Sequence, residues 1–173
     1  MNRLRKLSII TINCCLIFSA CTDKSGERLV NNKGNYSINK LSDWDYEIKN
    51  RSIMISQIRR YDSLSVTGTL IVAPGNSDLP SLDDTFTAFK NDLPRTLKDY
   101  QKINEGYSEI NGHPTRWIKL SYTLYNFKYI SLRYFMQLSE KTPVMIDCSS
   151  IDGTFEDFEE DFNEMVFSLR VEI

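Results

Sequence analysis

The sequence predicts an α+β domain in which helices pack on an antiparallel sheet. Two segments place apolar residues three or four positions apart, as amphipathic helices do. Before and between them, apolar and polar residues alternate, which is typical of half-buried strands. The chain has 173 residues, 41% of them hydrophobic and 25% charged. This balance favours one globular domain over a disordered, collagen-like or coiled-coil chain.

Each predicted helix carries an apolar stripe behind a capping residue. Ser81, with Asp84 three residues later, forms a capping-box-like start for the first helix. Pro94 is expected to kink or split that helix. Thr154 and Asp157 form a similar start for the second helix. The stripes are Leu82, Phe86, Phe89, Leu93, Leu97 and Tyr100 in the first, and Phe155, Phe158, Phe162, Met165 and Val166 in the second.

Alternating residues between the helices predict an antiparallel meander of four strands over about Ile103–Ser149. Near its start, Asn111-Gly112 is a strong signal for a type I′ hairpin turn. The predicted pairs are Ile103 with Leu120 and Tyr107 with Arg116. Earlier strands are predicted at Tyr36–Ile38, Trp44–Ile48, Ile53–Ile58 and Val66–Ala73, and a short strand follows the second helix.

The register of the second hairpin in the meander depends on the length of its turn. A two-residue turn at Asn126-Phe127 would put the apolar residues of its two strands on opposite faces. A three-residue loop, Asn126–Lys128, puts them on one face. We therefore predict an odd-length loop. The predicted pairs are Leu124 with Ile130, Tyr122 with Leu132 and Leu120 with Tyr134.

Four segments between Tyr36 and Val171 carry the pattern of a known family. They are YSINKLSDWDY with Trp44, the long helix behind Leu79-Pro80-Ser81, Glu109–His113 before a long strand, and a closing helix that ends in Phe167–Arg170. Together they resemble the PsbP-like superfamily, which includes the DcrB-like lipoproteins and the Ran-binding Mog family. The resemblance implies an α/β/α sandwich whose central antiparallel sheet of about six to seven strands is flanked by helices. It also implies a non-enzymatic binding or assembly protein.

Residues 1–20 predict export from the cytoplasm. Basic residues precede Leu7–Phe18, a stretch of twelve uncharged residues. As a helix it would span about 18 Å, well short of the ~30 Å hydrocarbon core of a bilayer. It therefore fits a signal peptide better than a transmembrane helix. The basic residues are Arg3, Arg5 and Lys6.

The end of this stretch, Ile17–Cys21, resembles the lipobox of bacterial lipoproteins. The resemblance implies cleavage before Cys21, attachment of palmitate-type lipid to its sulfur, and anchoring in a membrane. Thr22 at the next position favours the outer membrane, facing the periplasm. The alternative is ordinary cleavage nearby, which would release a soluble exported protein. Residues 21–34 are predicted to be the lipidated cysteine and a flexible linker, followed by the PsbP-like domain at 35–173.

The sequence gives little sign of enzyme chemistry. It contains no Ser-centred nucleophile elbow, phosphate loop or Rossmann fingerprint. His113 is the single histidine and lies at a predicted hairpin tip, where a catalytic imidazole is hard to orient. Cys148, the one thiol left after export, lies on the apolar face of a strand. We expect no catalytic residue, metal or cofactor, and the formal net charge of −2 does not indicate a nucleic-acid partner.

Two surfaces are candidate sites for a protein partner. The first is the second face of the meander, where aromatic residues and an arginine would form a hot spot if a helix does not cover them. The second is the acidic side of the closing helix, unless it is only a solvated helix face. The residues are Trp117, Tyr125, Tyr129, Arg133 and Phe135 on the first surface, and Glu156, Glu159 and Glu160 on the second.

We therefore predict a non-catalytic envelope lipoprotein that binds another protein in the periplasm or at the membrane surface. Two alternatives stay open: an immunity lipoprotein that neutralises a toxin, and a lipoprotein that binds a small ligand. An exposed aromatic or acidic patch without a deep polar pocket would favour a protein partner. A concave apolar pocket with a few convergent polar groups would favour a small ligand.

Overall fold

The computed structural model describes residues 26–62, 64–75, 79, 81–139 and 142–172. Within them the strands are β1 (Glu27–Asn31), β2 (Tyr36–Lys40), β3 (Asp45–Lys49), β4 (Ser52–Tyr61), β5 (Leu64–Pro74), β6 (Gln101–Ile110), β7 (His113–Leu124), β8 (Phe127–Ser139), β9 (Thr142–Ile151) and β10 (Arg170–Val171). The helices are α1 (Leu82–Thr96) and α2 (Phe155–Phe167). One antiparallel sheet has seven strands in the order β3-β4-β5-β9-β8-β7-β6, and a smaller one has the order β1-β2-β10. The predicted α+β fold with a central antiparallel sheet is confirmed.

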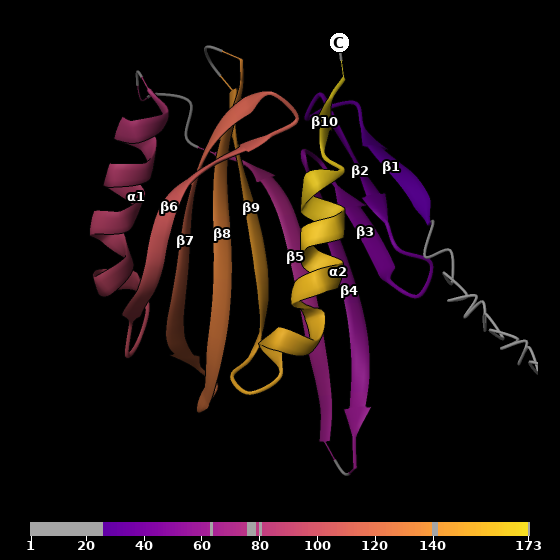
Figure 1. Ribbon diagram of the computed structural model, residues 1–173, viewed down its shortest axis with the longest axis vertical. Coiled ribbons are helices and arrows are strands. Elements are labelled where there is room, and N and C mark those ends of the chain that lie inside the picture. The colour runs from indigo at the N-terminus through magenta and orange to yellow at the C-terminus, as the bar shows by residue number, and fades with distance from the viewer. Residues whose placement is uncertain (1–25, 63, 76–78, 80, 140–141, 173) are drawn as a thin grey trace, which may run out of the picture.

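The two helices lie on opposite faces of the large sheet, over different strands (Figure 1). α1 packs on β7 and β8, whereas α2 packs on β9 and β5 and also contacts β2 of the small sheet. Successive side chains along β8 point alternately toward the face covered by α1 and the face covered by α2. Phe135 joins the apolar cluster of α1, and its neighbours Tyr134 and Met136 join the cluster of α2. Each helix therefore leaves part of its face of the sheet without a helical cover.

Trp44 lies at the centre of the larger core, where the small sheet, α2 and the large sheet meet. Its side chain is only 1% exposed. The indole packs edge-on against Phe158 and Phe162 of α2, with ring centroids 5.9 and 5.6 Å away. Aromatic pairs in this geometry add to the stabilisation from burial alone.

Helix α1 begins as its sequence predicts. The backbone N–H of Asp84 donates to Ser81 Oγ at 3.1 Å, so the predicted cap is formed. Pro94 does not split the helix, which runs unbroken to Thr96. Because Pro94 lies in the last turn, only one late backbone bond is lost, and the buried Leu93 holds this turn on the sheet.

Helix α2 begins at the predicted residue but without the predicted cap. Thr154 takes the N-cap position, yet its side chain makes no capping bond. Its hydroxyl instead donates to the carbonyl of Ile151 at 2.8 Å. Asp157 accepts a hydrogen bond from the Tyr61 hydroxyl at 2.6 Å, so its carboxylate is engaged by β4 rather than by the helix start.

The Asn111-Gly112 turn is confirmed, and the register that follows from it is correct over most of β6. Both residues have positive φ, 49° and 83°, as a type I′ turn requires. Tyr107 pairs with Arg116 as predicted. Between Lys102 and Asn104 the register shifts by a bulge, so Leu120 pairs with Lys102. The predicted pair of Ile103 with Leu120 is therefore wrong.

The predicted odd-length loop between β7 and β8 is also wrong. The turn has two residues, Tyr125 and Asn126, both with positive φ, and it pairs Leu124 with Phe127. Consequently the predicted pairs with Ile130, Leu132 and Tyr134 do not form. The apolar residues Ile118 and Leu120 of β7 face α1, whereas Leu132 and Tyr134 of β8 face α2. The expectation failed because it assumed that the alternating apolar residues of the two strands share one face of the sheet.

The predicted flexible linker at residues 21–34 contains a strand. β1 pairs with β2 from Glu27 opposite Lys40 to Asn31 opposite Tyr36. Leu29 is 3% exposed and belongs to the larger core. Burial of this side chain and pairing with β2 stabilise a segment whose Gly- and Asn-rich flanks resemble a linker. The folded domain therefore begins at β1, not at residue 35.

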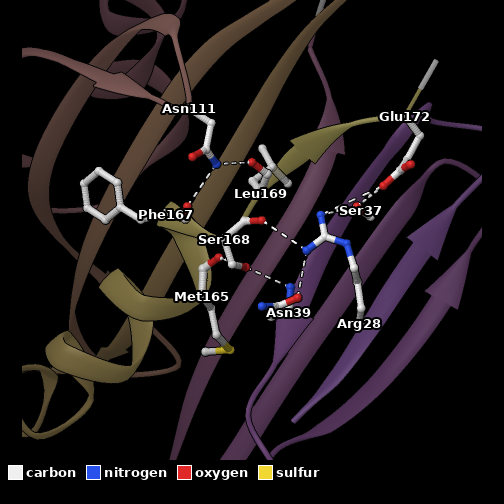
Figure 2. Close-up of polar contacts among 9 residues, drawn as sticks. All are labelled: Arg28, Ser37, Asn39, Asn111, Met165, Phe167, Ser168, Leu169 and Glu172. Atoms are coloured by element: carbon white, nitrogen blue, oxygen red, sulfur yellow. Dashed lines mark hydrogen bonds and ion pairs between the residues drawn. The ribbon is translucent and has the colours of Figure 1, made fainter. Parts of the chain in front are cut away.

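Polar groups from β1, β2 and the β6–β7 turn contact the C-terminal end of α2 (Figure 2). The Asn111 amide, from the β6–β7 turn, donates to the carbonyls of Phe167 at 3.0 Å and Leu169 at 2.5 Å. The backbone N–H of Asn39, on β2, donates to Ser168 Oγ at 2.8 Å. Arg28 of β1 donates to Asn39 Oδ1 at 2.8 Å, and its charge lies near the negative end of the helix dipole. The two Asn111 bonds satisfy carbonyls that the end of the helix leaves unpaired.

A small residue on β5 allows α2 to approach the sheet. A Cβ atom at Gly68 would lie 2.5 Å from a ring atom of Phe158. We expect Gly68→Ala to lower the free energy of unfolding by about 1–3 kcal/mol, because the ring would have to move within a packed core. Urea unfolding followed by circular dichroism measures this change.

The matched control is Gly153→Asn, at a position with φ of 83° and no neighbour within 4 Å of an added Cβ. Asparagine tolerates this conformation, so the control should change stability by less than about 1 kcal/mol. Equal stability of Gly68→Ala and the wild type would show that Phe158 does not pack directly on β5.

Candidate functional site

A groove of about 630 Å³ lies between α1 and strands β5, β8 and β9. We call it the α1 groove. It is lined by Pro74, Gly75, Leu79, Thr85, Ala88, Phe89, Asn91, Asp92, Leu93, Arg95, Thr96, Arg133, Phe135 and Met145. Phe135 and Met145 come from the sheet, and Phe89 and Leu93 from the helix. The Phe89 and Phe135 ring centroids are 4.6 Å apart, so the interior of the groove is mainly apolar.

One ion pair lies among these apolar side chains. Arg133 Nε is 2.9 Å from Asp147 Oδ2, and the two side chains are only 12% and 15% exposed. Ser131 Oγ donates to Asp147 Oδ1 at 2.7 Å, and the Arg133 guanidinium lies 5.4 Å from the Phe89 ring centroid. Pairing and hydrogen bonding offset the desolvation penalty of the two buried charges. The groove therefore contains a fixed polar group and no unpaired buried charge from this pair.

The helical rim of the α1 groove is open to water. Five lining residues of α1 are exposed, at positions 88, 91, 92, 95 and 96. The sequence analysis missed this rim, because exposed polar helix positions carry no pattern that distinguishes a groove wall from a free surface. The only available signal was that Ala88 is a small apolar residue outside the buried stripe.

A second groove, of about 380 Å³, lies between α2 and strands β6, β7 and β8. We call it the α2 groove. Its lining residues are Asn104, Ser108, Trp117, Lys119, Leu132, Tyr134, Glu159, Asn163 and Phe167. Lys119 Nζ is 3.0 Å from Glu159 Oε1 and 4.6 Å from the Phe155 ring centroid. The Tyr134 hydroxyl donates to Asn163 Oδ1 at 3.4 Å, and burial raises the pKa of this tyrosine, so it stays protonated.

The predicted aromatic surface is wrong as a single surface, because the register separates its members. Arg133 and Phe135 lie in the α1 groove, whereas Trp117 lies in the α2 groove on the other face. Tyr129 is half-buried, and Tyr125, 83% exposed, lies in the β7–β8 turn. Three of the five residues therefore line grooves, but not the same one.

The acidic residues of α2 also divide into groups. Glu156 and Glu160 are exposed, and each lacks an ion pair within the described residues. Glu159 is half-buried and pairs with Lys119. The buried Asp161 forms an ion pair of 2.6 Å with Arg59 of β4.

Arg59 contributes to the packing of α2, although no motif in the sequence singles it out. The Arg59 guanidinium lies 4.3 Å from the Phe158 ring centroid, and Trp44 Nε1 donates to Asp161 at 3.4 Å. The available signal was the spacing of two along β4, which puts Arg59 on the same face as Ile53 and Ile55.

Neither His113 nor Cys148 lies in a groove. His113 is half-buried at the start of β7. Cys148 is fully buried in the larger core. Burial and the nearby Asp147 carboxylate raise the pKa of the Cys148 thiol, which makes the reactive thiolate scarce at neutral pH.

The part of the chain that the structure describes contains no group of three or more histidine, cysteine, aspartate or glutamate side chains that could hold a metal ion. None of the helices in the same part is long and apolar enough to cross a membrane. Cys21, the predicted lipidation site, lies outside the described residues.

No family model matches the sequence, and a search of curated proteins gives no significant match. The structure nevertheless resembles solved structures. LpqN of Mycobacterium tuberculosis, a protein involved in cell envelope biogenesis, aligns with a TM-score of 0.58 and 11% identity, over 85% of this chain and 90% of LpqN. The Ran-binding protein Mog1p of Saccharomyces cerevisiae aligns with a TM-score of 0.58 and 13% identity, over 86% of this chain and 96% of Mog1p.

A third similar structure is cyanobacterial PsbP (CyanoP) from Synechocystis, with a TM-score of 0.57 and 16% identity, over 88% of this chain and 95% of CyanoP. The chain has a PsbP/Mog-like fold. The resemblance seen in the sequence is thereby confirmed at the level of the fold. Because the identities are this low, the PsbP/Mog-like fold does not by itself assign a ligand or a partner.

The reactivity of the Cys148 thiol tests whether this side chain is buried in the core. We expect Cys148 to resist iodoacetamide at pH 8 in the folded protein and to react readily in urea, because burial both shields it and raises its pKa. Peptide mass spectrometry distinguishes its modification from that of other cysteines. Rapid modification of Cys148 under native conditions would contradict its position in the core.

Proposed function

We propose that the protein is a non-catalytic lipoprotein of the bacterial envelope that binds another protein through the α1 groove. The observation that carries this proposal is the open groove, with an apolar interior, a fixed ion pair and an exposed helical rim. Aromatic and arginine side chains at a groove centre are typical of hot spots in protein interfaces. The half-buried Phe89 and Arg133 line the groove in this way, whereas Phe135 is buried beside them.

The openness of the groove favours a protein partner over a small ligand. Sites for small molecules usually bury most of the ligand surface. Here the exposed α1 residues Ala88, Asp92 and Arg95 would leave a small molecule in contact with water along one side. A protein could insert apolar side chains and cover the polar rim with its own surface.

The proposed location rests on the lipobox-like segment that ends at Cys21. Lipid on this cysteine would hold the domain at a membrane, and we place it at the outer membrane, facing the periplasm, because Thr22 follows. The envelope role of LpqN, which shares the fold, is compatible with this placement.

A second candidate function is the binding of a small amphiphilic ligand in the same groove. It is favoured by the volume of about 630 Å³, which lies within the ~300–1,000 Å³ typical of ligand pockets. Thermal-shift screening of the Ala88→Glu and wild-type proteins distinguishes the two candidates. A small ligand would stabilise the wild type alone, without any protein present.

The anchor is tested by the substitution Cys21→Ser. We expect the wild type to incorporate radioactive palmitate and to sediment with membranes, whereas Cys21→Ser should lose both properties, because the acylated sulfur is absent. Labelling in the native host followed by membrane fractionation measures both. Palmitate incorporation that persists in Cys21→Ser would refute the proposed lipidation site.

The groove is tested by two neighbouring substitutions on α1. Ala88→Glu introduces a charge into the groove, and Thr87→Glu introduces the same charge at an exposed position outside the lining. We expect Ala88→Glu to reduce recovery of the crosslinked partner at least about tenfold, because a carboxylate would be desolvated in the interface. Thr87→Glu should leave recovery unchanged.

Crosslinking in the native host, followed by quantitative mass spectrometry, gives the amounts recovered with each variant. Circular dichroism confirms that both variants are folded. If the two substitutions have equal effects on the recovered partner, the α1 groove is not the binding surface.

A further inference from the structure

The large sheet has one edge that is long and accessible. β6 is the last strand of the sheet, and within the described residues it pairs only with β7. Beyond the bulge at Lys102 and Asn104 its pairing is regular as far as Ile110. The other edge, β3, has five residues, all exposed, with three charged side chains. Short charged edges are typical of strands protected against further pairing, whereas a long regular edge is a template for another strand.

The β6–β7 turn shows which backbone groups of β6 are free. In a two-residue turn the residues on either side, here Ile110 and His113, form a hydrogen-bonded pair. Because hydrogen bonding alternates along an antiparallel pair, Ser108 and Gly106 also face β7. The N–H and C=O groups of residues 105, 107 and 109 therefore point away from β7. The Glu105 N–H already donates to Asn104 Oδ1 at 2.9 Å, so the outward N–H groups open to a new partner are those of residues 107 and 109.

The α2 groove lies directly beside this edge. Asn104 and Ser108 of β6 line it. Ser108 Oγ is buried and makes no hydrogen bond in the structure. Gly106 lies under the indole of Trp117, where an added Cβ would be 2.7 Å from the ring. A strand added to β6 would place alternate side chains over this aromatic surface.

The surroundings of the edge are acidic. Glu109 on β6 and Glu160 on α2 are exposed and have no ion pair among the described residues. Glu160 lies three and seven residues before the groove residues Asn163 and Phe167, so it occupies the same side of the helix. An added segment with basic side chains would complement these charges.

The charges disfavour a second copy of β6 as the added strand. Antiparallel registers centred on Glu105, Tyr107 or Glu109 would each put two glutamates directly opposite one another. Like charges in this position are destabilising. A different, basic segment avoids this repulsion.

We propose that β6 binds an extended, basic segment of a partner protein by strand addition, with alternate side chains of the segment seated over the α2 groove. The C=O groups of residues 105, 107 and 109 and the N–H groups of residues 107 and 109 provide the hydrogen bonds. This surface is separate from the α1 groove, so the inference goes beyond the function proposed above and can fail independently of it.

The test uses the full chain in detergent micelles and three fluorescent decapeptides. The first alternates lysine with valine, the second alternates glutamate with valine, and the third is the lysine peptide with N-methyl groups on alternate residues. Fluorescence anisotropy gives the affinities, and hydrogen exchange gives the protection of individual amides. We expect the lysine peptide to bind at least about tenfold more tightly than the other two, and to protect the amides of residues 107 and 109.

Two proline substitutions form a matched pair at the two edges. Glu109→Pro removes an outward N–H of β6, and Ile48→Pro removes an outward N–H of β3, since the Lys49–Ser52 pair closes that hairpin. We expect Glu109→Pro to weaken binding of the lysine peptide at least about tenfold and Ile48→Pro to leave it unchanged. Glu109→Gln, which keeps the N–H, should weaken it only about threefold. If Glu109→Pro does not fold, the N-methylated peptide on the wild-type protein makes the same test.

Three results would overturn the inference. They are no binding of the lysine peptide at millimolar concentration, binding without protection of residues 107 and 109, and protection of these two amides by dimerisation in the absence of peptide. Ala88→Glu, which alters the α1 groove, should bind the lysine peptide as the wild type does. Loss of partner recovery by Ala88→Glu together with absent peptide binding would support the proposed function and reject strand addition.

Discussion

The two-residue turn between β7 and β8 determines how the rest of the domain must pack. It places the apolar residues of β7 and those of β8 on opposite faces of the sheet. Both faces then need a cover, and the chain provides α1 for one and α2 for the other (Figure 1). Because each helix is narrower than a seven-stranded sheet, a strip beside each helix is left unfilled. The α1 groove and the α2 groove are these two strips.

The local signals in the sequence were sufficient for the elements but not for the register. Ser81 caps a helix and Asn111-Gly112 turns a hairpin because both depend on backbone chemistry within a few residues. The β7–β8 register instead depends on which faces are buried, which is a property of the whole sheet. Trp117 and Phe135 occupy the positions of the alternating pattern that were expected to be polar, yet they are as apolar as their neighbours. The pattern therefore fits equally well whether the apolar residues of β7 and β8 share one face or lie on opposite faces. β1 was not predicted because its short sequence, ERLVN, lies between Gly- and Asn-rich flanks, and the burial of Leu29 depends on tertiary contacts that the sequence does not mark.

The sequence identified some of the residues that line the grooves, but it did not predict on which face of the sheet each one lies. Three residues of the predicted aromatic surface, Arg133, Phe135 and Trp117, each line a groove, whereas Tyr125 and Tyr129 line neither of the two. Their separation onto two faces followed from the register error. The helical rim of the α1 groove and the role of Arg59 require tertiary contacts, because an exposed arginine and one that pairs with a buried aspartate have the same sequence signature.

The small sheet links the predicted anchor to the grooves mechanically. Four residues separate Cys21 from Gly26, directly before β1, and such a segment spans at most about 18 Å when fully extended. β1 is hydrogen-bonded to β2, and Arg28 and Asn39 connect both strands to the end of α2 (Figure 2). With lipid on Cys21, the domain would therefore be held close to the bilayer rather than free to sample the periplasm. Partners within reach are then membrane proteins or proteins that approach the membrane surface, and binding at α2 would be restricted in orientation by the same contacts.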